Sequence, residues 1–557
     1  MGRRRGPEGA YTFDLVPDEG EAGPDAVPDG DGGGGDGAGG GAPPRGPGRW
    51  QTAWRRTSRR TRLTVLVVGV ALVGTYGVVR EVSDRDHVAE LRAAAGGVLD
   101  LSVPPQEIWR VEDLEESADV SRGLVAVAGD VAAVQRLDHL IGLDLATGER
   151  RWTVDLMDPS GTCGPGMEFW SERVELNPSE QVVCVGESGA GEQTVTVVEP
   201  DGTVLARRAI GDGYDLAVPG PGSSVLTATW VGEPDDVDVS LQGDPLTDLR
   251  VTGEIDDGYD LEVTLVDALT GDERWTSVVP FGEVLDTDQC VRWSAGGRNA
   301  ELDRAGTIDH VVGERLVGVS GCGILAYLTP TGSPLDLSGL QSSADEVVRR
   351  VRPLADGGFA VSAGGWGRAA WDQDVLDADG VLRFSVEGRL LDPWATDGAA
   401  DGVAGDRWLV ARADGTVAVD GTGEEVWSSD VQAVEVLART ARTAVVMDVR
   451  DRLVGLDLAD GTVLWVRPDV VDEVAATTGE ARHGGVRSVF TDGAVVALVV
   501  PVYTDASVIS LWRAVDVTTG EDLWSSQQVE DGWGVEVAVD GHLLRWWPKG
   551  LAALGAT

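Results

Sequence analysis

A short phrase recurs along this 557-residue chain and constrains its fold more than any other feature. An apolar run ends in Asp, a Thr or Asp and then a Gly follow three and four residues later, and a Trp stands eight residues after the first Asp. Four copies share this spacing, at 143–152, 266–275, 456–465 and 515–524. A fifth, at 419–427, is one residue shorter.

The phrase predicts a β-hairpin, because an apolar strand leads into a turn whose Gly can adopt positive φ, and a second strand opens at the Trp. Worn copies without the Trp occur at 199–202, 329–332 and 377–380, the last leading to Phe384. Further short apolar runs precede each copy. The repeating unit is therefore about four strands over some 40 to 65 residues, which is typical of propeller blades.

The two ends of the repeat region are complementary. Residues 105–110 resemble an outer strand without a blade before it, and 534–548 resemble inner strands that lack their outer one. We expect the two ends to pair in one blade. All candidate turns together allow nine blades, but we interpret one worn copy as an insertion and predict eight four-stranded blades, with seven as the next choice.

Tryptophan is the most frequent aromatic residue, with 19 Trp against 6 Phe and 6 Tyr. A large aromatic residue at one fixed register is explained most simply as a packing residue between neighbouring blades. The alternative is a sugar-stacking or cofactor-binding role. The residues to which we assign blade docking are Trp109, Trp152, Trp275, Trp427, Trp465 and Trp524.

The Asp-x-x-Thr-Gly-x-x-x-Trp phrase resembles the tryptophan-docking repeat of the PQQ-like, quinoprotein-type β-propeller superfamily over most of residues 105–548. The resemblance implies an all-β propeller. WD-repeat propellers are the competing family, but Gly-His and Trp-Asp marks are missing at blade spacing. One Lys among 45 basic residues is typical of a GC-rich, actinobacterial-type genome.

The resemblance does not by itself imply chemistry, because one fold serves several functions. Quinoprotein dehydrogenases carry an adjacent Cys-Cys disulfide and a calcium held by acidic and amide side chains. This chain has no Cys-Cys, and its two asparagines, Asn177 and Asn299, lie in unpromising loops. No Cys-x-x-Cys-His haem site is present either. We therefore predict no cofactor.

Other catalytic patterns are equally weak. The five histidines are scattered without zinc-ligand spacing. Ser320 lies in Gly-Val-Ser-Gly-Cys, which lacks the last Gly of a nucleophile elbow. An acidic stretch between Glu233 and Asp260 could hold calcium, but it has no EF-hand spacing, and a solvated surface hairpin is the simpler interpretation. We predict no catalytic or metal site.

The N-terminal part differs in kind. Residues 17–48 are too poor in large apolar groups to fold, so tail 1–62 is predicted to be disordered. Residues 63–79 carry no charge and follow an Arg cluster, which predicts one transmembrane helix with the tail in the cytoplasm. A buried soluble helix or a cleaved signal peptide is the alternative. An uncleaved anchor exports the rest of the chain.

Four cysteines, Cys163, Cys184, Cys290 and Cys322, all lie in the predicted exterior part. They allow three pairings. The sequential one, Cys163 with Cys184 and Cys290 with Cys322, closes loops of about 20 and 30 residues, and free buried thiols are the alternative. Disulfides agree with an exported protein.

These observations predict a tail at 1–62, a membrane helix at 63–79, a juxtamembrane linker at 80–104 and a propeller at 105–557. A formal charge of -48 disfavours nucleic acid as a partner. We interpret the protein as a non-catalytic extracellular binding or scaffold module in the plasma membrane, whose partner is a protein or another cell-envelope component. A divergent quinoprotein oxidoreductase and a cell-envelope assembly scaffold are the alternatives.

Overall fold

The computed structural model divides the chain into two compact units, Met1–Gly77 and Val78–Thr557. It describes residues 88–556 of the second unit, with gaps at 95, 113–123, 137, 157–160, 171–172, 177, 188–191, 212, 236, 238, 243–249, 285–286, 294–299, 338–347, 355–356, 365–371, 397–406, 469–481, 484, 504–507, 531–533 and 548–549. Within this part no helix has the length and apolarity to cross a membrane. The predicted tail and membrane segment 63–79 lie outside it.

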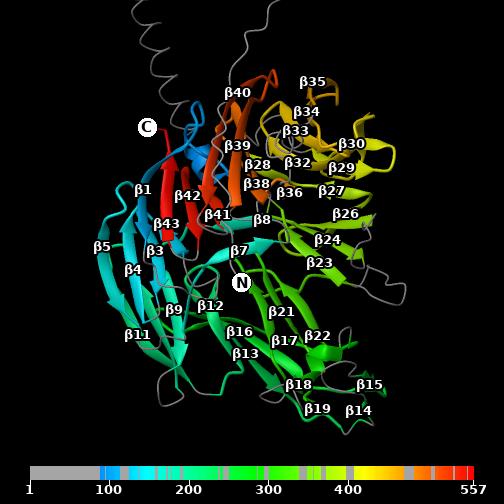
Figure 1. The fold of residues 1–557 in the computed structure, drawn as a ribbon. Helices are drawn as coiled ribbons and strands as arrows, with labels where there is room; N and C mark the ends of the chain where they lie inside the picture. The colour runs from blue at the N-terminus through cyan, green and yellow to red at the C-terminus, as the bar shows by residue number, and fades with distance from the viewer. Residues whose placement is uncertain are drawn as a thin grey trace, which may run out of the picture. The chain divides into compact units, whose positions relative to one another are not determined.

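Nine antiparallel sheets follow one another and form the blades of an all-β propeller (Figure 1). Blade 1 joins the two ends of the repeat region, since β1 (Gln106–Glu112) pairs with β43 (Gly550–Gly555), which continues to β42 (His542–Trp547) and β41 (Val535–Val539). In Figure 1 the blue strand β1 lies beside these red strands. The predicted pairing of the two ends is confirmed.

Blades 2 to 4 each have four strands in the blade sheet. Blade 2 contains β2 (Leu124–Ala128), β3 (Val131–Arg136), β4 (His139–Asp144) and β5 (Arg150–Asp155). Blade 3 contains β6 (Thr162–Gly164), β9 (Val182–Glu187), β10 (Gln193–Val198) and β11 (Val204–Gly211). Blade 4 contains β12 (Leu216–Gly220), β13 (Ser224–Val231), β16 (Asp260–Asp267) and β17 (Glu273–Val279).

Blades 5 to 7 follow the same order. Blade 5 has three strands, β20 (Asp309–Val312), β21 (Val317–Gly321) and β22 (Ile324–Leu328). Blade 6 contains β23 (Val348–Pro353), β24 (Phe359–Gly364), β25 (Asp372–Leu376) and β26 (Leu382–Glu387). Blade 7 contains β27 (Arg389–Leu391), β29 (Trp408–Arg412), β30 (Gly415–Val419) and β31 (Glu425–Ser429).

Blades 8 and 9 each have an additional strand. Blade 8 contains β32 (Ala433–Arg439), β33 (Thr443–Asp448), β34 (Leu453–Asp457) and β35 (Val463–Arg467), and β28 (Pro393–Thr396) runs parallel to β32. Blade 9 contains β37 (Ser488–Thr491), β38 (Val495–Tyr503), β39 (Val508–Asp516) and β40 (Asp522–Glu530), and β36 (Arg482–His483) also pairs with β38.

Three hairpins stand outside the blade sheets. They are β7 (Met167–Trp170) with β8 (Arg173–Leu176), β14 (Ser240–Gln242) with β15 (Arg250–Thr252), and β18 (Val291–Trp293) with β19 (Ala300–Leu302). A 3-10 turn, η2 (Thr287–Cys290), leads into β18. The second and third hairpins belong to insertions before and after the outer hairpin of blade 4.

Nine blades replace the predicted eight, because no worn copy of the phrase is an insertion. The copies at 199–202 and 377–380 connect the last two strands of blades 3 and 6, and the copy at 329–332 follows the last strand of blade 5. The hydrophobic core gives the same count. Nine clusters of buried side chains each span two consecutive blades, and the last joins blade 9 to blade 1.

The predicted linker contains an ordered stretch. Residues 88–93 form a short helix. The Val98 amide donates to the Thr491 carbonyl of blade 9 at 2.9 Å, and the Leu99 amide donates to the Gly541 carbonyl of blade 1 at 3.3 Å. Leu101 is fully buried in the core between these blades. These residues therefore hold the junction of blades 9 and 1.

Candidate functional site

The Asp of the repeated phrase organises its own turn. In blade 2, Asp144 Oδ1 accepts hydrogen bonds from the Ala146 amide, the Thr147 amide and the Thr147 hydroxyl at 2.9, 2.8 and 3.0 Å. Asp267 and Asp516 bind their turns in the same way. The Asp and Thr of the phrase are therefore explained by turn geometry, since an acceptor satisfies turn amides that lack backbone partners.

Two of these turns carry an additional ion pair. Arg151 Nε donates to Asp144 Oδ2 at 2.9 Å, and Arg274 Nη2 donates to Asp267 Oδ2 at 2.8 Å. Hydrogen bonds from Arg151 and the turn lower the pKa of Asp144 to about 2, and those from Arg274 and Thr270 lower the pKa of Asp267 to about 2. Both carboxylates remain charged in mild acid.

All six predicted docking tryptophans lie between blades. Each indole N–H donates to a backbone carbonyl of the following blade or, for Trp524, of the segment before β1. The pairs are Trp109 with Leu145, Trp152 with Pro200, Trp275 with Pro330, Trp427 with Leu458, Trp465 with Val517 and Trp524 with Leu101, at 2.7 to 3.0 Å. The indole thus serves as both an apolar filler and a hydrogen-bond donor at each junction.

The Trp ring packs against the Gly of the turn in the following blade. Gly520 has φ of +68°, and a Cβ atom built there would lie 2.5 Å from the Trp465 ring. Gly461 has the same relation to Trp427 at 2.4 Å. A side chain at either position would collide with the indole, so both the close approach and the positive φ require Gly.

Three junctions use other side chains. Phe384 of blade 6 lies against Gly423, and Leu335, after β22, lies against Gly380. Arg208 of blade 3 covers Gly271 and donates to the Ala268 and Asp267 carbonyls at 3.0 and 2.8 Å.

Only one of these three residues could be predicted from its spacing. Phe384 stands four residues after its turn Gly, as the tryptophans do, so the spacing pointed to it. Leu335 and Arg208 stand three and six residues after theirs, and their roles were missed.

Both disulfides have the sequential pairing. Cys163–Cys184 joins directly opposed residues of β6 and β9 in blade 3. Cys290–Cys322 joins η2 to the turn between β21 and β22 in blade 5, within a small apolar cluster that includes Ile255. The first disulfide therefore reinforces blade 3, whose junction residue is Arg208. The second reinforces blade 5, which has three described strands.

The described part of the chain brings no predicted catalytic or metal-binding set together. Ser320 lies in β21, paired with Asp309 across the sheet, and Asn177 and Asn299 are outside the described residues. Within the described ranges no group of three or more His, Cys, Asp or Glu side chains is arranged to hold a metal ion.

Part of the acidic stretch is used internally. Asp260 accepts from the Phe281 amide at 2.8 Å, and Arg304 donates to the Asp257 carbonyl at 3.0 Å. Asp236, Asp238, Asp244 and Asp248 lie outside the described residues. Two carboxylates of this stretch, those of Asp257 and Asp260, thus accept hydrogen bonds from backbone amides.

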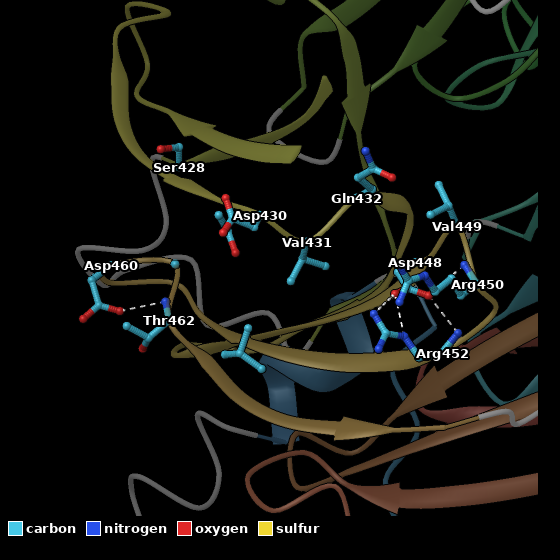
Figure 2. Close-up of a pocket in the computed structure, with 13 residues that line it drawn as sticks. Ser428, Asp430, Val431, Gln432, Asp448, Val449, Arg450, Arg452, Asp460 and Thr462 are labelled. Carbon is cyan, nitrogen blue, oxygen red and sulfur yellow. Dashed lines mark hydrogen bonds and ion pairs between the residues drawn. The ribbon is translucent and has the colours of Figure 1, made fainter. Parts of the chain in front are cut away.

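A groove of about 640 Å³ lies between blades 7 and 8 (Figure 2). One wall is the end of β31 and the link to β32, with Ser428, Asp430 and Val431. The other walls are two turns of blade 8, one with Asp448 to Arg452 and the other with Asp460 to Val463. The Trp427 contact with Gly461 holds these blades together beside the groove. We take this groove as the candidate site.

The groove has separated charges. Figure 2 shows Asp430 and Asp460 at one side and Arg450 at the other. All three are exposed. Asp448, at the base, is buried and accepts from Arg452 Nε at 2.8 Å.

Two opposing effects determine the charge of Asp448. Burial by itself would raise the pKa of Asp448, but hydrogen bonds from Arg452 and the Arg450 amide outweigh it and lower the pKa. The Asp448–Arg452 pair therefore supports the turn, while Asp430, Asp460 and Arg450 are exposed at the groove. Such an arrangement suits recognition of a polar, partly charged partner.

The blade order, the turns and the docking contacts define the class of fold, an all-β propeller whose described part has nine blades. In agreement, residues 94–292 match the family model described as outer membrane protein assembly factor BamB. No curated protein matches the chain.

The solved structures that match this chain include three of different kinds. The computationally designed Ika8 protein is 14% identical, with 73% of this chain and 99% of that chain covered and a TM-score of 0.29. BamB from Moraxella catarrhalis is 18% identical, with 62% and 85% covered and a TM-score of 0.22. A europium-containing methanol dehydrogenase is 12% identical, with 79% and 84% covered and a TM-score of 0.29.

Proposed function

We propose that this protein is a non-catalytic binding or scaffold module, displayed outside the plasma membrane by an anchor at 63–79, and that it holds its partner in the groove between blades 7 and 8. The groove carries the proposal, because side chains from two blades combine apolar and charged groups around one open volume. The family match to an assembly factor supports a protein partner. The two disulfides support an oxidising compartment.

Site-specific photo-crosslinking in intact cells tests the groove. Val449 lines it and is 56% exposed, so a photoreactive residue there should give a discrete crosslinked species. Val381 on blade 6 is 60% exposed and lies outside the groove, so it is the matched control. Equal crosslinking at both positions, or none at Val449, would contradict the assignment of the site.

The proposed display outside the cell has its own test. Protease added to intact cells should degrade the propeller and spare the tail. A C-terminal tag that remains intact until the cells are lysed would contradict export.

A further inference from the structure

The outer strand of blade 8 has an apolar surface next to the groove. Val463, Leu464 and Val466 of β35 are 46%, 44% and 43% exposed, although they belong to a five-residue strand. Trp465 between them is buried against blade 9. β35 pairs with β34 on one side and is the last strand of its sheet. Among the described residues its other backbone edge is unpaired, and three of its five side chains are apolar and exposed.

Three other outer strands are protected by charge, whereas β31 and β40 resemble β35, with the exposed apolar residues Val426 and Leu523 before their Trp. In β5, β17 and β26 an Arg precedes the docking aromatic residue, and in the first of these Arg151 also forms an ion pair with Asp144. At the same position β35 has Leu464. Its one charged residue, Arg467, is paired with Asp522 of blade 9. Natural proteins use charged residues to prevent strand addition at sheet edges, and β35 lacks that protection.

The apolar edge is continuous with the groove. Val463, the first residue of β35, lines the groove together with Asp460 and Thr462 of the preceding turn. A segment that lies along β35 would thus leave the strand directly at the groove. The two features form one extended surface rather than two separate ones.

Charge decides what can occupy this surface. Asp430 and Asp460 are exposed, and neither forms an ion pair with a basic side chain in the described part of the chain. The chain as a whole carries a formal charge of -48. A second copy would bring the same negative charge to the surface, whereas a basic segment would be attracted.

We propose that β35 accepts an added strand from a partner, an extended segment that alternates aliphatic and basic residues. Its aliphatic side chains cover Leu464 and Val466, its backbone pairs with the free edge of β35, and a basic side chain beyond the strand reaches Asp430 and Asp460. This mode of recognition is β-augmentation. The proposal rests on the proposed binding function and names the partner chemistry of the same site.

A synthetic peptide tests strand addition with the purified full-length protein. The probe is a capped seven-residue peptide of alternating Val and Lys, carrying a fluorescent label for anisotropy. The control peptide has the same sequence with alternate backbone amides methylated, so that it keeps the charge but cannot form a ladder. We expect saturable binding of the first peptide only. This peptide should slow amide hydrogen exchange in 463–467 and leave exchange in β26 unchanged.

Two matched variants separate apolar strand addition from simple charge attraction. Leu464→Glu with Val466→Glu should weaken binding about tenfold, although it makes the surface more acidic, because the apolar cover is lost. Val381→Glu with Leu382→Glu adds the same charge on blade 6, at residues 60% and 54% exposed, and should leave binding unchanged. Unchanged melting temperatures show that both variants fold.

Three results would overturn the inference. The first is equal binding of the methylated peptide, and the second is tighter peptide binding by the Leu464→Glu, Val466→Glu variant. The third is self-association of the full-length protein that the same variant abolishes, because a second copy would then be the occupant. Crosslinking at Val449 reports on the groove independently. Peptide failure with Val449 crosslinking intact therefore refutes strand addition alone, and loss of both refutes the proposed function as well.

Discussion

Trp465→Ala is the most direct test of how the blades are held together. The Trp465 side chain is 9% exposed and lies between Gly455 of its own blade and Gly520 of blade 9. Its Nε1 donates to the Val517 carbonyl at 2.9 Å. The substitution removes the ring from the core between blades 8 and 9 and leaves two glycines that cannot fill the space.

The magnitude follows from the area that the ring buries. A Trp side chain buries about 200 Å², which at about 25 cal/mol per Å² corresponds to about 5 kcal/mol. A compact unfolded state reduces this by roughly 10 to 40%. A residual cavity adds to the cost. We therefore expect Trp465→Ala to lower the free energy of unfolding by about 3 to 5 kcal/mol.

Chemical denaturation of the full-length protein measures this change. Trp465→Phe should cost less, because it keeps most of the apolar ring and loses mainly the N–H donor. Leu464→Ala, at the exposed neighbour, should change stability by less than about 0.5 kcal/mol. A Trp465→Ala protein that melts like the wild type but loses its partner would refute the packing argument and make Trp465 a recognition residue.

Two further predictions concern the turns and the cofactor. Because the pKa of Asp144 falls from 3.8 to about 2 on folding, its ion pair stabilises the protein above about pH 4 and is lost toward pH 2. The difference in melting temperature between the wild type and Asp144→Asn should therefore shrink over this range. A constant difference would contradict this prediction. Added PQQ and calcium should give no saturable change in quinone absorbance and no alcohol- or sugar-dependent dye reduction, since the chain has no Cys-Cys pair to cover a quinone; stoichiometric binding with dye reduction would identify a quinoprotein.

The local parts of the fold could be predicted from the sequence. The Asp-x-x-Thr-Gly spacing encodes a turn whose Asp binds its own amides, so four or five consecutive residues are enough to specify it. The sequential pairing of the disulfides was one of the three that the sequence allowed, and the closure of blade 1 followed from an outer strand at one end and inner strands at the other. Each of these features depends on neighbours in sequence or on a simple count.

The number of blades depended on contacts that no single segment contains. Whether a worn turn completes a blade is decided by the side chain that covers it, and that residue belongs to the preceding blade. Arg208 reaches the Ala268 carbonyl, 60 residues along the chain, and has neither the type nor the spacing of a docking Trp. Since Arg, Leu and Phe can each fill the position, the Trp pattern alone undercounted the blades.

The candidate site likewise exists only in the folded chain. Asp430, Asp448 and Asp460 come from three separate connections, and they line one groove because the contact of Trp427 with Gly461 sets blade 7 against blade 8. The apolar residues of β35 read in the sequence like any buried strand, because a strand pattern does not tell which edge is covered. The sequence by itself determined the repeating hairpin, and packing between blades determined which of its surfaces stay open.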